Sequence, residues 1–244
     1  MSGIERILLA ASGAETPQWV ETAAELARAL EAELTALFVE DVDLLRASRL
    51  PSSWEIGRLT AQSRPLQPER TQRSLQAAAR RLEQALREAA RARSLRFSFS
   101  VLQGRPWELL LAYAAAPNRL IYLPSRRLTL ASPRPLVVAF DDSMAGVAGL
   151  TVGLRLAHSA RRTCVVLVAA QDAQALHERM RQVEWAMHGR QTVLFERLAA
   201  LDAERLAAAA RRLMPAALIL PAAAEMQRLA QRCLGLGCDV LLAT

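Results

Sequence analysis

The sequence predicts an α/β fold made of two Rossmann-like parallel-sheet repeats. Short apolar runs, typical of strands buried on both faces, alternate along the 244 residues with amphipathic segments typical of helices. Near the middle, Pro135-Leu-Val-Val-Ala-Phe-Asp-Asp-Ser143 passes directly from five apolar residues to two carboxylates and a hydroxyl. The order of elements then begins again, and Leu120-Ile-Tyr-Leu-Pro124 has a counterpart in Leu218-Ile-Leu-Pro221. A repeated α/β unit of this length indicates duplicated domains rather than a solenoid.

Residues 1–124 form the first predicted repeat. We expect its strands at residues 4–11, 34–40, 95–102 and 119–124. We expect its helices from the cap Thr16-Pro17 to about residue 33, over 69–94, and from 104 to about 116. Residues 41–68 should hold a short helix near 42–48 and then a loop. A loop this long is more often functional or partner-facing than most, and a cover over the sheet edge is an equal alternative.

Residues 125–134 form a linker bounded by prolines, too short for another helix and strand. The first repeat should therefore lack its last helix and strand. The second repeat, residues 135–244, keeps both. Its expected strands are 135–141, 163–170, 192–197, 216–221 and 238–243, and its expected helices are 144–159, 172–188, 202–213 and 223–234.

The composition excludes several mechanisms. All 31 basic residues are arginine, so a P-loop and Schiff-base chemistry, which both need lysine, are excluded. Cys164, Cys233 and Cys238 form no disulfide framework and no four-ligand zinc set, which fits a reducing compartment. No apolar run reaches the ~18–20 residues needed to span a bilayer, and the chain enters its first strand almost at once. We therefore expect a cytoplasmic protein without membrane contact. The net charge of +7 is spread evenly, so nucleic-acid binding is not favoured.

Asp141, Asp142 and Ser143 are the first candidate site. They follow a buried strand, and ligands of open α/β sheets bind where such strands end. The two carboxylates could coordinate Mg²⁺ or border a nucleotide. The alternative, which the sequence favours, is that they cap the helix that begins near Ser143.

The second candidate site is a cationic patch for an anion or a protein partner in the 41–68 segment. Its members are one tryptophan and four arginines: Arg46, Arg49, Trp54, Arg58 and Arg64.

Several motifs resemble the universal stress protein family in tandem form, whose fold is adenine nucleotide alpha hydrolase-like. Glu5-Arg-Ile-Leu-Leu-Ala-Ala-Ser12 is similar to that family's first strand. Gly104-Arg-Pro-Trp-Glu-Leu-Leu-Leu-Ala112, followed by Asn118-Arg-Leu-Ile-Tyr122, resembles its Gly-x-Pro-x-Glu-x-Ile helix and next strand. Cys238-Asp-Val-Leu-Leu242 is similar to its closing strand.

The resemblance implies a nucleotide site, and the chain departs from it. Members of the family that bind ATP have an Asp after the first strand and a glycine-rich phosphate loop after the fourth. Here the first repeat has Ala11-Ser12-Gly13 at the Asp position. After the fourth strands stand Pro124-Ser-Arg-Arg-Leu-Thr-Leu-Ala and Pro221-Ala-Ala-Ala-Glu-Met-Gln-Arg. These lack the glycines that let a backbone approach phosphates. ATP is therefore disfavoured in both degenerate sites.

We expect a non-enzymatic role in stress response or regulation through an unidentified protein partner, with no cofactor. The two repeats should pack edge to edge as an intramolecular pseudo-dimer, and a homodimer of the whole chain is a further assembly. A nucleotide-binding module that uses Asp141 and Asp142 is the alternative, and a nucleotide-dependent enzyme is the third.

Overall fold

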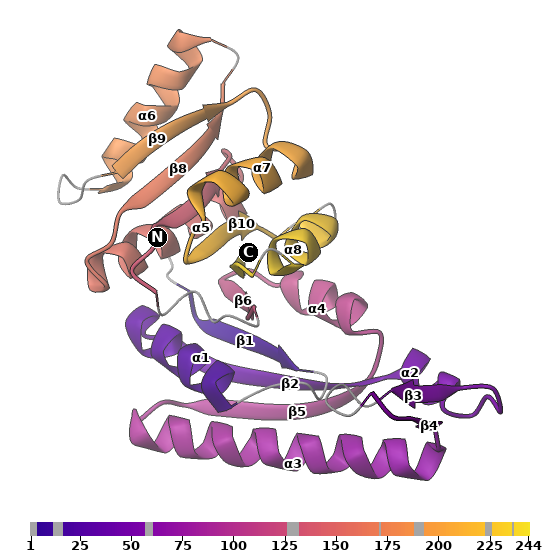
Figure 1. Cartoon of the computed structure of the whole chain (residues 1–244). Helices are drawn as coiled ribbons and strands as arrows, with labels where there is room; N and C mark the ends of the chain where they lie inside the picture. The colour runs from indigo at the N-terminus through magenta and orange to yellow at the C-terminus, as the bar shows by residue number, and fades with distance from the viewer. Residues whose placement is uncertain are drawn as a thin grey trace.

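The computed structural model describes residues 4–11, 17–56, 61–125, 132–170, 172–187, 193–222, 226–235 and 237–244. Strands of the first half are β1 (Arg6–Ala11), β2 (Glu33–Asp41), β5 (Phe97–Gly104) and β6 (Arg119–Leu123). Strands of the second half are β7 (Leu136–Phe140), β8 (Cys164–Ala169), β9 (Val193–Leu198), β10 (Ala217–Pro221) and β11 (Asp239–Ala243). All nine form one sheet, in the order β5-β2-β1-β6-β11-β10-β7-β8-β9 (Figure 1).

Helices connect these strands. In the first half they are α1 (Pro17–Leu30), α2 (Val42–Ala47), α3 (Pro68–Ala92) and α4 (Pro106–Ala114). In the second half they are α5 (Met144–Ser159), α6 (Ala173–Met187), α7 (Ala203–Leu213) and α8 (Met226–Gly235). The mostly parallel α/β fold expected from the sequence is confirmed, and the helix and strand boundaries shift by a few residues from the predicted ones.

The helices cover both faces of the sheet. One core cluster joins apolar residues of α1, α3, α5 and α6 to one face. A second cluster joins those of α4, α7 and α8 to the other face. Strand residues alternate between the clusters: Leu8 lies in the second, and its neighbours Ile7 and Leu9 lie in the first. This alternation is the period of a strand buried on both faces, which explains the continuous apolar runs in the sequence.

Helix α5 approaches the sheet closely because glycines face it. A Cβ at Gly153 would overlap Val138 Cγ2, and one at Gly149 would lie 3.4 Å from Ile219 Cγ2. Larger side chains on this face of α5 would hold the helix further from β7 and β10. The helix begins at Ser143, whose side chain accepts a hydrogen bond of 2.9 Å from the Gly146 N–H.

The two halves meet where β6 pairs with β11, the antiparallel junction in the sheet, with Tyr122 opposite Leu241. Asp239 is fully buried there. One of its carboxylate oxygens accepts a 2.6 Å hydrogen bond from the Ser125 N–H, and the other lies 3.5 Å from the Tyr122 hydroxyl. Burial, with the nearby Asp239, raises the pKa of Tyr122, so the hydroxyl stays protonated as a donor.

The strand order is the same on the two sides of this junction. Starting from β6, the first half reads β6-β1-β2-β5, and starting from β10 the second half reads β10-β7-β8-β9. β11 is the additional strand of the second half. Among the described residues between β6 and β7 there is neither a helix nor a strand. The boundaries 1–124, 125–134 and 135–244, and the origin of the halves as two repeats, stay predictions.

The 41–68 segment differs from the expected short helix and loop. The helix is present as α2, and it is followed by a hairpin of β3 (Trp54–Ile56) and β4 (Ser63–Pro65). Arg64 lies opposite Glu55 in this hairpin. The hairpin projects past the end of β2 and lies beside the start of α3 (Figure 1). No helix in the described parts of the chain is long and apolar enough to cross a membrane.

Candidate functional site

Asp141 lies where β7 ends, as the sequence predicted, and its carboxylate contacts the start of α5. Asp141 Oδ1 accepts a 3.1 Å hydrogen bond from the Ser143 N–H and a second one from the Ser143 hydroxyl. A Cβ at Gly146 would lie 2.5 Å from the Asp141 carbonyl oxygen and would overlap its carboxylate. Asp141 Oδ1 is therefore occupied by contacts at the start of α5, which is the alternative that the sequence favours.

Asp142 points to another element. Its carboxylate forms an ion pair with Arg179 of α6. The two aspartates thus bind different partners. Half of the segment predicted to face them, Pro221–Met226, lies outside the described residues, since 223–225 are not described.

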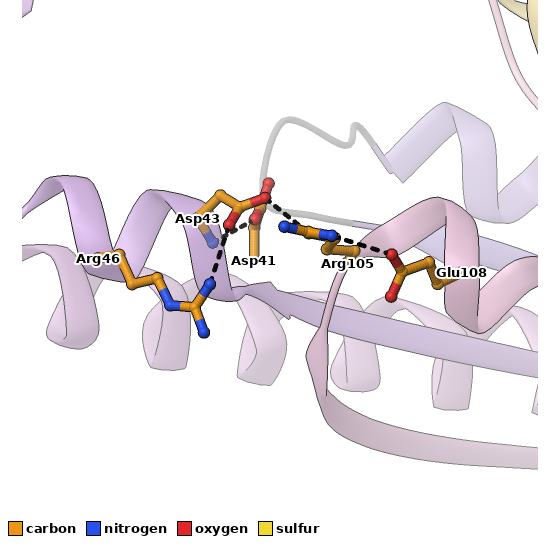
Figure 2. A network of polar contacts seen from close by, with 5 residues as sticks. All are labelled: Asp41, Asp43, Arg46, Arg105 and Glu108. Carbon is orange, nitrogen blue, oxygen red and sulfur yellow. Dashed lines mark hydrogen bonds and ion pairs between the residues drawn. The ribbon is translucent and has the colours of Figure 1, made fainter.

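A second polar cluster lies at the carboxyl end of β2, where Gly104 of β5 pairs with Asp41 (Figure 2). Asp41 caps α2, and its Oδ1 accepts a 2.8 Å hydrogen bond from the Asp43 N–H. Arg105 bridges Asp43, at 3.1 Å, and Glu108 of α4, at 3.2 Å. Arg46 lies 3.5 Å from Asp43 Oδ1. We call these five residues the Arg105 cluster.

The Arg105 cluster links α2 to the start of α4. Hydrogen bonds to Glu108 and Asp43 raise the pKa of Arg105, whose side chain is exposed. Because solvent screens exposed ion pairs, these contacts orient α2 more than they stabilise the fold. In the described parts of the chain no group of three or more His, Cys, Asp or Glu side chains could hold a metal ion.

The hairpin exposes apolar side chains. Leu50, Trp54 and Ile56 are 57%, 59% and 69% exposed. Trp54 and Ile56 share one face of β3, because they are two residues apart. Glu55, between them, is on the opposite face and pairs with Arg64. The apolar face of β3 is thus exposed to solvent, and the opposite face, which carries the ion pair, is partly exposed as well.

Val101 and Leu102 on the edge strand β5 are also 44% and 45% exposed. They are adjacent in the strand and therefore lie on opposite faces of the sheet. We define the hairpin surface as Leu50, Trp54 and Ile56.

Four of the five residues of the predicted cationic patch lie in the described part of the chain. Arg46, Arg49, Trp54 and Arg64 are all exposed on the α2–hairpin segment, and Arg58 lies outside the described residues. Arg46 and Arg64 are each paired with an acid of the same segment. The patch therefore carries less net positive charge than its arginines alone suggest. Its apolar component, which the sequence analysis missed, is the larger feature. The alternation Trp54-Glu-Ile56 was the signal that could have revealed it.

The three cysteines are buried, and burial decides their chemistry. It raises the pKa of Cys164 and of Cys238 to about 12 and that of Cys233 to about 11. Since the thiolate is the reactive form, these thiols are inert near neutral pH.

No protein-family model and no curated protein sequence matches the chain. Solved structures do. A universal stress protein from Archaeoglobus fulgidus DSM 4304 aligns with a TM-score of 0.61 at 10% identity, over 99% of this chain and 97% of that one. A putative universal stress protein from Pseudomonas aeruginosa UCBPP-PA14 aligns with a TM-score of 0.52 at 15% identity, over 98% and 93%. A functionally unknown protein from P. aeruginosa PAO1 aligns with a TM-score of 0.51 at 15% identity, over 98% and 92%.

The chain therefore belongs to the α/β proteins with a Rossmann-like, mostly parallel sheet. Its fold is that of the universal stress proteins, along almost the whole length of the chain. The resemblance seen in the sequence motifs is confirmed at the level of the fold.

Proposed function

We propose that this universal-stress-like protein has a non-enzymatic regulatory role and acts by binding a protein partner through the hairpin surface. The observation that carries the proposal is the outward apolar face of the hairpin. Exposed aromatic and aliphatic side chains that cluster on one surface are typical of protein-binding sites. The partner's surface would be an apolar groove with polar groups of both signs at its rim, because Asp43, Arg46 and Arg49 are exposed in the segment directly before Leu50.

Two observations support a role without catalysis and without ATP. The carboxylate at the end of β7 serves a helix cap, and its neighbour pairs with Arg179. The buried thiols have raised pKa values, which disfavours a cysteine nucleophile.

A paired-variant experiment tests the role of the hairpin surface. Proteins that bind the full chain in its native extract are identified by crosslinking and mass spectrometry, and the affinity of the strongest is then measured with purified components. We expect Trp54→Ser with Ile56→Thr to weaken that binding at least about tenfold, as loss of an aromatic anchor does. Leu194→Thr is the matched control, since Leu194 is 52% exposed on the opposite edge strand, β9. Equal binding by the two variants would contradict the proposal.

Equilibrium dialysis with ATP, ADP, AMP and cyclic nucleotides tests whether the protein acts without a bound nucleotide. We expect no saturable binding in the micromolar range. Micromolar binding that disappears in Asp141→Ala would instead support the nucleotide-binding alternative.

A further inference from the structure

A cavity of about 500 Å³ lies near the start of β7, away from the carboxyl strand ends that carry the two candidate sites. It is bounded by α1 of the first half, and by the end of α5 and the start of β7 of the second half. Its volume falls within the range of small-molecule sites. Neither candidate site includes any residue that lines it.

The inner wall of this cavity is apolar. Leu26, Leu136 and Leu156 line it and are themselves almost completely buried in the core. These leucines belong to α1, β7 and α5, so both halves contribute to the wall. A wall of this kind accepts a compact hydrocarbon group, because the group leaves water without displacing a polar partner.

The outer wall is polar and carries two guanidinium groups, from Arg28 at the end of α1 and Arg162 directly after α5. Arg162 is partly buried, and this burial lowers its pKa, the direction expected of a cation that has lost water. The one acid on the wall, Glu25, lies 3.7 Å from Arg93 and is partly neutralised from outside the cavity.

The end of α5 does not prevent an anion from binding here. A helix C-terminus repels anions through its free carbonyl groups. In α5, however, the Arg162 N–H donates to the Ala157 carbonyl at 2.8 Å, and the Ala160 N–H donates to that of Leu156 at 3.0 Å. The hydroxyls of Thr22 and Ser159 on the same wall donate to the carbonyls of Gln18 and Leu156, so the donors for an anion are the two guanidinium groups.

We propose that this cavity binds a small amphipathic carboxylate. Its aromatic or branched apolar body lies against Leu26, Leu136 and Leu156, and its carboxylate binds Arg28 and Arg162. Arginine suits this role because its planar guanidinium matches a carboxylate in two parallel hydrogen bonds. Since both halves line the cavity, the bound molecule stabilises the contact of α1 with α5, and it can act independently of the hairpin surface.

The test uses the full chain and the fluorescent anion 8-anilinonaphthalene-1-sulfonate, with 1-naphthoate as the carboxylate competitor. We expect one saturable dye site from which 1-naphthoate displaces the dye. The neutral 1-naphthalenemethanol should compete about tenfold less well, because it makes no charge-assisted hydrogen bond. Equal competition by the two naphthalene compounds would overturn the carboxylate assignment.

Variants locate the site. Arg28→Gln with Arg162→Gln should weaken 1-naphthoate at least about tenfold. Ala160→Trp, at an exposed position on the rim, should block the dye without disturbing the core. Arg81→Gln on the exposed face of α3 is the charge control, and Trp54→Ser with Ile56→Thr is the control for dye on the hairpin surface. Dye binding that survives Ala160→Trp, or that is lost in the hairpin variant, would overturn the proposal.

Discussion

The ends of β2 and β7 use aspartate for opposite purposes. At β7, Asp141 turns inward onto Ser143, and the chain continues directly into a helix of 16 residues packed on the sheet. At β2, Asp41 caps a helix of only 6 residues, after which the chain leaves the sheet as a hairpin. A carboxylate at a helix start thus closes one strand end, where Asp141 holds the Ser143 cap of α5, and begins a projecting segment at the other, where Asp41 itself caps α2. The length and packing of the following helix, rather than the aspartate, decide which outcome results.

The largest loss of stability should follow a substitution that fills the space beside Asp141 at the end of β7. In Gly146→Ala the new methyl group would overlap the Asp141 carboxylate, so the cap and the first turn of α5 must move. We expect a loss of about 3 kcal/mol in the free energy of unfolding, measured by urea denaturation. Gly235→Ala is the control, because a Cβ there meets no atom within 4 Å. Equal stability of the two variants would refute the tight cap.

The buried thiols of the second half give its stability a pH dependence. Their pKa values rise from 9.0 in the unfolded reference to about 11–12, so the protonated form favours the folded state. This stability is complete below pH 9 and is lost as the pH rises toward the folded-state pKa. We expect a loss of about 1 kcal/mol per thiol between pH 8 and pH 10. In Cys164→Ala this loss of stability between pH 8 and pH 10 should be smaller by the contribution of one thiol. Urea denaturation at each pH measures it.

Removing the aspartates tests the comparison directly. Asp141→Ala deletes the acceptor of the Ser143 N–H and should cost about 1 kcal/mol, within the range of helix caps. Asp43→Ala removes only exposed ion pairs and should cost less than about 0.5 kcal/mol. Thermal unfolding of the two variants side by side measures the difference. A larger cost for Asp43 would mean that the Arg105 cluster supports the fold and not only the direction of α2.

The smallest effect on stability should follow Arg105→Gln. The variant breaks the bridge from Asp43 to Glu108, and we expect a change below about 0.5 kcal/mol. Its consequence should instead be local, since α2 and the hairpin lose a contact with α4. Hydrogen exchange of residues 42–56 should become faster, while that of β1 stays unchanged. If residues 42–56 exchanged at the same rate in the variant as in the original protein, the cluster would not orient the hairpin.

The sequence was sufficient for the fold because the strands are buried on both faces. Runs such as Leu136–Phe140 and Cys164–Ala169 are uninterrupted apolar segments, and they fit few alternatives. It was also sufficient for the cap at Asp141, since the donors of a cap lie only a few residues away. The hairpin was not predicted, because β3 and β4 have three residues each and no Asn-Gly or Asp-Gly turn between them. The cavity between α1 and α5 could not be predicted either, since Leu26 and Leu156 meet only through long-range packing.

The junction of β6 and β11 has a consequence for the synthesis of the chain. Tyr122 and Asp239, which meet there, are separated by 117 positions in the sequence. While the ribosome makes the intervening residues, β6 presents a free, strongly apolar edge, which is the kind of surface that pairs with other nascent chains. The pairing of β6 is therefore completed only when Asp239–Ala243 has been made, and until then this edge of Arg119–Leu123 is open to pairing with other chains.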